Sequence, residues 1–210
     1  VVNSKGLYSI ENYLMARRLM YWQVYLHKTT VSSEKVLVNA LLRAKKLARE
    51  GKEIFATPCL KYFLYNDIDA ETFKTDEEAQ RNYALLDDND IWSAIKVWIN
   101  NDDKVLSLLS TDLLNRNLFK VEISGTPINE ERIENIKDAL AKKFNISMED
   151  TKFLISVDTI QKDMYDVHDD HITILFKDNT LKDISEASEV MNIALLSKKI
   201  RKYYLCYQRF

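Results

Sequence analysis

Residues 17–50 read RRLMYWQVYLHKTTVSSEKVLVNALLRAKKLARE, a stretch without glycine or proline. From residue 32 to residue 50, apolar side chains return every three or four positions, which is the spacing of one face of an α-helix. That face consists of Val36, Leu37, Ala40, Leu41, Ala44, Leu47 and Ala48. Gly51 is a typical helix terminator. Residues 10–26 are predicted as a preceding helix, which is either separate or continuous with the second, because no strong breaker lies between them.

The rest of the chain contains more predicted helices than strands. Only three glycines and two prolines occur, which favours long helices and few tight turns. An apolar segment that opens at Pro58 is followed by helices predicted at residues 75–86, 89–100, 102–114, 129–144 and 185–193, with Asn129 as an N-cap. Strands are predicted at residues 118–123, 152–157 and 171–177, with a tight turn at 178–179. Residues 202–207 are predicted as a last strand or a helix tail.

These elements predict a mainly α N-terminal part, residues 1–115, followed by an α+β C-terminal part, residues 116–210. The expected fold is a helical bundle packed on a small mixed or antiparallel sheet with helices. Hydrophobic residues make up 46% of the chain and charged residues 30%, as in ordinary globular proteins. The two cysteines, Cys59 and Cys206, are expected to be reduced cytosolic thiols. No apolar run is long enough to suggest a membrane span, and we expect a cytoplasmic protein.

Arg17, Tyr21, Tyr25 and Lys28 fall on one face of the first helix if its period is 3.6 residues. Guanidinium and ammonium groups hold phosphate oxygens, and tyrosine offers a ring for stacking and a hydroxyl for donation. This face therefore suits a phosphorylated ligand that carries a ring. The alternative is an amphipathic helix with half-buried tyrosines and solvated charges.

The same residues resemble a motif of the HD-domain phosphohydrolases, in particular of the deoxynucleoside triphosphate triphosphohydrolases. Arg17, Tyr21 and Tyr25, followed by His27 and Lys28, stand in the order found after the catalytic core of those enzymes. A second match is Arg-Asn-Leu-Phe-Lys at residues 116–120. The likeness is to the HD-associated C-terminal region of bacterial members, and it covers nearly the whole chain.

The resemblance implies a role for each matched residue. Arg17 would hold a phosphate of a deoxynucleoside triphosphate substrate, Tyr21 would lie near the scissile phosphate, and Tyr25 would pack on the sugar. Lys28 completes the expected substrate-binding set. Arg116 and Lys120 match residues that contact a regulatory nucleotide at a subunit interface in the mammalian enzyme.

Arg116 and Lys120 are four residues apart. In an extended strand both side chains would share one face, about 13 Å apart. The alternative is an exposed strand edge that carries charge to prevent pairing.

The metal site of the family, an early His, a His-Asp pair and a distant Asp, does not appear in this sequence. The only histidines are His27, His168 and His171. We therefore expect the C-terminal part of a longer hydrolase, inactive alone, whose divalent metal (Mg, Mn, Zn, Fe or Ni) lies in a missing HD domain, with no catalytic or metal-binding residue here. His168, Asp169, Asp170 and His171 form either a weak metal site or, as we prefer, a solvated turn. His27 is expected to have a packing or hydrogen-bonding role.

The expected partners are a deoxynucleoside triphosphate substrate or effector and further copies of the chain, in a dimer or tetramer. An alternative function is a non-catalytic oligomerisation module whose aromatic residues form the interface. These are Tyr13, Tyr21, Trp22, Tyr25, Trp92, Trp98 and Phe119. The net charge of −2 disfavours nucleic-acid binding. The basic residues Arg43, Lys45, Lys46 and Arg49 are interpreted as a solvated helix face, with a phosphate-contacting edge as the alternative.

Overall fold

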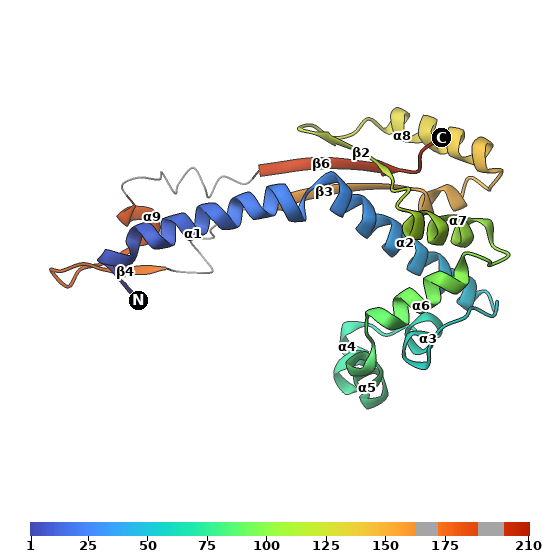
Figure 1. Ribbon diagram of the computed structural model, residues 1–210, viewed down its shortest axis with the longest axis horizontal. Helices are drawn as coiled ribbons and strands as arrows, with labels where there is room; N and C mark the ends of the chain where they lie inside the picture. Colours follow the sequence, from blue (N-terminus) through green and yellow to red (C-terminus); the bar gives the residue numbers. More distant parts are fainter. Residues whose placement is uncertain (163–171, 189–199) are drawn as a thin grey trace. The chain divides into compact units, whose positions relative to one another are not determined.

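The structure is a computed structural model of the 210-residue chain, and it describes residues 1–162, 172–188 and 200–210 (Figure 1). The described residues form two compact units. The first unit comprises Val1–Thr30, Ile123–Pro127 and Asp158–Tyr204, and the second comprises Val31–Glu122, Ile128–Val157 and Leu205–Phe210. The predicted division near residue 115 follows the change in secondary structure along the chain and stays a prediction, whereas these units are grouped by spatial contacts.

The helices begin with the 3₁₀ turn η1 (Ser4–Gly6), α1 (Leu7–Met20) and the π-helical turn η2 (Tyr21–Tyr25). They continue with α2 (Lys28–Arg49), α3 (Pro58–Tyr65), α4 (Ala70–Thr75), α5 (Glu77–Leu85), α6 (Asp88–Trp98) and α7 (Lys104–Asn115). After these come α8 (Glu130–Phe144), the 3₁₀ turn η3 (Asp150–Phe153) and α9 (Ile184–Ala187). The strands are β1 (Val2–Asn3), β2 (Lys120–Ser124), β3 (Ile155–Lys162), β4 (Thr173–Leu175), β5 (Leu181–Asp183) and β6 (Ile200–Tyr207).

Helix α2 supplies the core of the second unit. Most of the predicted apolar face is buried, and Val36, Ala40, Ala44 and Leu47 have no exposed surface. Leu37 and Leu41 of that face are only partly buried. Buried polar side chains of α2 each reach a partner far away in the sequence, as buried polar groups require. The Ser32 hydroxyl donates to the Phe119 carbonyl at 2.9 Å, and the Asn39 amide donates to the Phe153 carbonyl at 2.9 Å.

Aspartates set the starts of the short helices in the second unit. Asp69, Asp76, Asp87 and Asp103 each accept backbone N–H groups at the N-terminus of α4, α5, α6 or α7. Such bonds satisfy donors that have no partner within the helix. They hold the pKa values of Asp69 and Asp76 below the ordinary value. The separate helix α4 was not predicted, and Asp76 explains why the predicted helix at 75–86 begins at Glu77 instead.

Helix α8 and the second sheet complete this unit. The sheet has the strand order β2-β6-β3, and its residues 120–122, 155–157 and 205–207 belong to the second unit. Asn129 caps α8 by accepting from the Glu131 N–H at 2.8 Å, as predicted. The buried Gln208 amide donates to the Asp112 carboxylate at 2.7 Å, which fixes the end of the chain to α7. Burial raises the pKa of Asp112.

The first unit is built around a small mixed sheet and α1. Strand β1 pairs parallel to β4, and β4 pairs antiparallel to β5. Its core contains Leu7 and Leu14 from α1 with Ile174, Ile184 and Ala187. The turn between β4 and β5 lies where it was predicted, and Asn179 adopts the left-handed conformation with φ 63°.

The fold class predicted from the sequence is confirmed, with helices packed on small three-stranded sheets. Residues 202–207 form a strand, not a helix tail. Strand β3 begins at Ile155 and not at residue 152, because residues 150–153 form the turn η3. Helix α9 ends at Ala187, where Ser188 is extended, and residues 189–193 of the longer predicted helix lie outside the described residues.

Candidate functional site

Arg17, Tyr21 and Tyr25 come together in the first unit as the sequence predicted. The Arg17 guanidinium carbon lies 5.8 Å from the centre of the Tyr21 ring. The Tyr21 and Tyr25 ring centres are 5.2 Å apart with an interplanar angle of 45°. Arg17 and Tyr25 are exposed and Tyr21 is partly exposed. We call these three residues the Arg17 stack. It presents a cation and two aromatic rings in a row.

The Arg17 stack lies where the helix changes its hydrogen-bond pattern. The Leu26 N–H donates to the Tyr21 carbonyl five residues back at 2.8 Å, so Tyr21–Tyr25 forms a π-helical turn. Such turns hold one extra residue in a helix and occur often at functional sites. The 3.6-residue period that predicted the stack therefore holds from Arg17 to Tyr21, whereas the contact of Tyr21 with Tyr25 forms across the wider π turn.

The two N-terminal helices are separate, and Lys28 does not continue the predicted face. The chain leaves the helical conformation at Leu26, where φ is −100° and ψ is 14°. Lys28 is the first residue of α2, so the continuous period that placed it beside Tyr25 does not apply.

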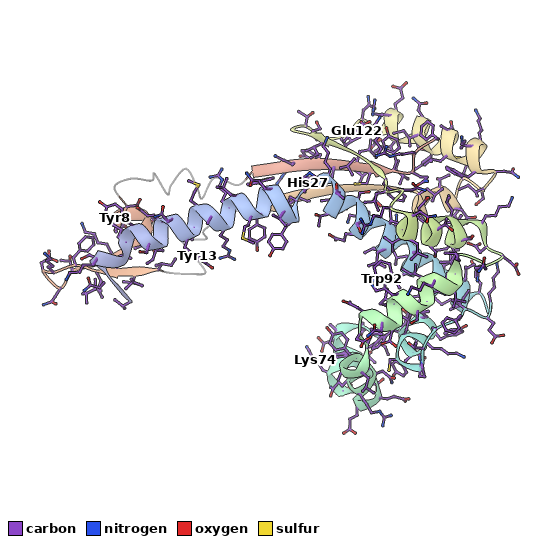
Figure 2. The ribbon with its side chains drawn as sticks, viewed as in Figure 1. Tyr8, Tyr13, His27, Lys74, Trp92 and Glu122 are labelled. Atoms are coloured by element: carbon purple, nitrogen blue, oxygen red, sulfur yellow. The ribbon has the colours of Figure 1, made fainter. Side chains whose placement is uncertain are left out.

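His27 lies just before α2 (Figure 2), and its Nδ1 accepts the Thr29 N–H at 3.2 Å. This contact is the hydrogen-bonding role expected of His27, in the position of a helix N-cap.

Trp22 has a cation as a neighbour. The Lys202 ammonium lies 4.1 Å from the centre of the Trp22 ring, and the ring is only partly buried. A cation at this distance over an indole ring is a favourable cation–π contact. Trp22 therefore connects the turn η2 to strand β6 within the first unit.

Arg116 and Lys120 do not share a strand, and the predicted geometry is wrong. Arg116 ends α7 in the left-handed conformation with φ 59°, and β2 begins only at Lys120. The two side chains therefore do not share one strand face. Both residues are exposed, and their regulatory role stays a prediction.

Lys120 belongs to a charged cluster of the second unit around Glu122 (Figure 2). The Tyr207 hydroxyl donates to Glu122 at 2.8 Å, Arg132 contacts the same carboxylate at 2.6 Å, and Lys120 lies 3.3 Å from it. Burial raises the pKa of Glu122, but the hydrogen bonds from Tyr207, Lys120 and Arg132 outweigh this and hold the pKa low. An anionic ligand at Lys120 would have to compete with Glu122.

The sequence interpretation missed a buried ion-pair network around Arg43. Arg43 is 6% exposed and was wrongly interpreted as part of a solvated face. Its guanidinium donates to both Asp103 oxygens, at 3.0 and 2.7 Å, and also to Asp150. The signal was present, because Arg43 lies seven residues after the buried Val36 and four before the buried Leu47, which puts it on the apolar face.

The described residues contain no candidate metal centre. No group of three histidine, cysteine, aspartate or glutamate side chains gathers within residues 1–162, 172–188 and 200–210. His168, Asp169, Asp170 and His171 lie outside the described residues. The donor set in the described part of the chain therefore does not fit a divalent metal.

Among the helices in the described ranges, none combines the length and the apolar character that crossing a bilayer requires.

Comparisons with known proteins place the chain next to a phosphohydrolase. No protein-family model matches the sequence. Over 120 residues, 57% of this chain, the sequence is 32% identical to the uncharacterized protein YwfO of Bacillus subtilis (strain 168), of which it covers 26%. A hypothetical protein from Aquifex aeolicus matches the whole chain with a TM-score of 0.55 at 20% identity, over 44% of its own chain, and so shares the fold alone.

A stronger match is the crystal structure of a phosphohydrolase from Bacteroides thetaiotaomicron VPI-5482. It matches all of this chain with a TM-score of 0.93 at 55% identity, and this chain covers 52% of it. The chain thus spans about half the length of these solved structures and about a quarter of the curated relative. Over its full length, this chain is similar to a protein named a phosphohydrolase.

Proposed function

We propose that this chain is part of an HD-family phosphohydrolase that acts on deoxynucleoside triphosphates, and that the Arg17 stack helps to hold the nucleotide. The observation that carries this proposal is the row of one guanidinium and two phenol rings, each within 6 Å of the next. A nucleotide offers the complementary groups, which are charged phosphates, a sugar and a flat base. The similarity to a named phosphohydrolase supports the chemical class.

Each member of the stack suits one part of the nucleotide. The exposed Arg17 guanidinium can bind two phosphate oxygens at once. Tyr25, 52% exposed, can pack against the sugar and leave no room for a 2′-hydroxyl, which would favour deoxynucleotides. Tyr21 lies between them and can donate a hydrogen bond to phosphate. Lys28, at the start of α2, is proposed as a further phosphate contact.

The proposal for this chain concerns nucleotide positioning, together with a regulatory surface at Arg116 and Lys120. Because the described residues do not fit a metal site, we assign no step of hydrolysis to them. The divalent metal of the family would be held by other residues of the whole enzyme, whose solved relative is about twice as long as this chain.

Replacing Arg17 by alanine is expected to weaken dGTP binding to the 210-residue chain by about tenfold or more, because it removes a hydrogen bond between charged groups. Isothermal titration calorimetry with dGTP and with GTP measures this effect and the sugar preference. Arg18→Ala is the matched control, since it removes the same charge one position away. If only Arg18→Ala weakens dGTP binding, the phosphate contact belongs to Arg18 and not to Arg17. Equal dGTP affinities of the wild type, Arg17→Ala and Arg18→Ala would refute a role of the Arg17 stack in binding.

The same preparation tests the location of the metal centre. With Mg²⁺ or Mn²⁺ and dGTP, the chain alone is expected to release no triphosphate. Robust release would contradict the assignment of the metal centre to residues beyond this chain, while the binding data would still decide the role of Arg17.

A second candidate function is assembly, and the exposed apolar side chains of α1 favour it. Tyr8 and Tyr13 stand out from α1 (Figure 2) with 57% and 61% of their surface exposed. Leu19 and Met20 are 47% and 50% exposed on the same helix. Apolar surface of this kind often marks a protein interface. Trp98 and Phe119, which the sequence grouped with the interface aromatics, are instead buried at 0% and 2% exposure.

If α1 forms the interface of a homo-oligomer, Leu19→Glu is expected to shift the chain towards the monomer in sedimentation velocity, because a charge would be buried in the contact. The control Leu85→Glu alters a leucine of the second unit that is 63% exposed, and should leave the sedimentation coefficient unchanged. A wild-type chain that sediments as a monomer at all concentrations would exclude this function for the isolated chain.

A further inference from the structure

One face of α2 forms the wall of a hollow in the second unit. Its residues follow the spacing of neighbours on a helix surface, three or four positions apart. The hollow has a volume of about 580 Å³, within the range of small-molecule sites. It is lined by Asn39, Leu42, Lys45, Lys46, Arg49 and Glu50 of α2 and its end, together with Lys152 and Phe153 of η3. We call it the α2 hollow.

The residues that line the α2 hollow carry a positive formal charge, although the whole chain does not. Four of its lining residues are lysine or arginine and one, Glu50, is acidic, which gives a formal lining charge of +3. The whole chain has a formal net charge of −2. The positive charge is therefore a local property of this surface, and it would attract an anionic ligand.

Two exposed carboxylates already bridge these cations in pairs. One oxygen of Glu149 lies 2.8 Å from the Lys46 ammonium and 3.4 Å from the Lys152 ammonium. One oxygen of Asp67 contacts both Lys45, at 3.4 Å, and Arg49. A single oxygen between two cations is the arrangement that a phosphate oxygen adopts.

Neither carboxylate is a lining residue of the hollow, and both can give way to a ligand. The side chains of Glu149 and Asp67 are 66% and 76% exposed. Exposed ion pairs of this kind stabilise a protein by only about 0–1 kcal/mol.

An aromatic ring holds one pair of cations in position. The Lys46 and Lys152 ammonium groups lie 5.9 and 5.3 Å from the centre of the Phe153 ring, which is only 5% exposed. Two lysines tethered over one ring lose less conformational freedom when a ligand binds between them. Leu42, 52% exposed, adds an apolar contact beside the charges.

We propose that the α2 hollow binds an oligophosphate, either inorganic or as the phosphate chain of a nucleotide. Its phosphate groups take the places of the Glu149 and Asp67 carboxylates, one between Lys46 and Lys152 and another between Lys45 and Arg49. A single phosphate satisfies only one of these pairs, so the two pairs together select a ligand with at least two linked phosphates. The hollow shares no residue with the Arg17 stack, and it stands independently of the proposed substrate site.

Isothermal titration calorimetry of the 210-residue chain with inorganic triphosphate and with orthophosphate tests the hollow. Triphosphate is expected to bind at least about tenfold more tightly than orthophosphate, because it engages both pairs of cations. Lys46→Glu and Lys152→Glu are each expected to weaken triphosphate binding by about tenfold or more. Glu149→Gln is expected to strengthen it, because the competing carboxylate is lost. A titration with dGTP shows whether a nucleoside on the phosphate chain adds affinity.

Lys137→Glu is the matched control for these substitutions. Like Lys152, Lys137 forms an ion pair with a glutamate three residues away, Glu134, at 2.7 Å. Lys137 does not line the hollow. An equal loss of affinity in Lys137→Glu would show a general charge effect and would overturn the proposal, as would a wild-type chain that binds no triphosphate. Circular dichroism shows that each variant is folded.

Two further outcomes separate this site from its alternatives. A loss of triphosphate binding in Arg17→Ala, with Lys46→Glu unchanged, would place the ligand at the Arg17 stack and overturn the α2 hollow alone. Displacement of triphosphate by a single-stranded RNA oligomer at far lower concentration would assign the cationic face to nucleic acid. The buried Phe153 ring, which offers little surface for base stacking, argues for the small molecule.

Discussion

Arg43→Met is expected to lower the free energy of unfolding by about 3 kcal/mol, the cost of leaving one side of a buried ion pair without its partner. The side chain of Arg43 is 7% exposed, and those of Asp103 and Asp150 are 11% and 21% exposed. Methionine fills much of the same volume but leaves both carboxylates without the guanidinium. Urea denaturation followed by circular dichroism measures the change. Lys137→Met, in an exposed ion pair, should cost less than about 1 kcal/mol.

The same network predicts how stability depends on pH. Burial raises the pKa values of Asp103 and Asp150, but hydrogen bonds and the charge of Arg43 outweigh it, so both pKa values lie below the ordinary one. A carboxyl whose pKa is lowered by folding stabilises the protein above the pKa it has in the unfolded chain, about 4. That contribution is lost as the pH falls from about 4 through the lowered values. Arg43→Met should flatten this acid-induced loss, and an unchanged slope would show that Arg43 does not hold these carboxylates ionised.

Trp98→Ala is expected to destabilise the chain by about 3–5 kcal/mol, the usual cost of removing a large aromatic side chain from a core. Trp98 ends α6 with no exposed surface, and its indole N–H donates to the Phe55 carbonyl at 2.9 Å. The substitution removes the ring, leaves a cavity and takes away the donor for that carbonyl. Chemical denaturation followed by far-ultraviolet circular dichroism avoids the loss of the fluorescent reporter.

Trp92 provides a matched control on the same helix (Figure 2). It is the same residue type, but 43% of its surface is exposed. Trp92→Ala should therefore cost clearly less than Trp98→Ala, by about 2 kcal/mol or more. An equal loss of unfolding free energy in the two variants would mean that burial does not determine how much each tryptophan of α6 stabilises the chain. It would contradict the packing of this helix.

Local signals in the sequence identified most helix starts correctly. Asn129 acts where it was predicted, because its side chain accepts the backbone N–H two residues ahead. Asp76 terminates one helix and caps the next, because its carboxylate accepts the backbone N–H groups of Glu78 and Ala79. The short helix α4, which precedes Asp76, has six residues and no buried side chain. No periodic spacing of apolar residues therefore predicts it.

The candidate site was predictable in part. The Arg17 stack followed from residue type and spacing within one helix, where neighbours in space are neighbours in sequence. The π-helical turn through Tyr25 has no comparable pattern in the residues themselves, and it changed the position expected for Lys28. Arg116 shows the same limit, because it ends α7 in the left-handed conformation and β2 begins only at Lys120.

The α2 hollow and the Arg43 network depend on partners that are distant in the sequence. Asp103 and Asp150 lie 60 and 107 positions away from Arg43, and Glu149 lies 103 positions away from Lys46. The basic residues at positions 43–49 of α2 were therefore interpreted from the sequence as one solvated face. The 3.6-residue period predicts which residues are neighbours of these side chains on the helix. It does not predict which acidic and aromatic side chains from distant segments contact them in the folded chain.

The sequence by itself determined the helical character, the apolar face of α2, the caps and the Arg17 stack. Each of these depends on interactions over a few residues or on a regular period, and such interactions are read directly from residue order. Only the tertiary structure decided that Arg43 is buried, that Lys120 is engaged by Glu122, and that four cations surround one hollow. The energy of a charge depends on its distance from other charges and on its exposure to water, and both are set when the distant segments pack together.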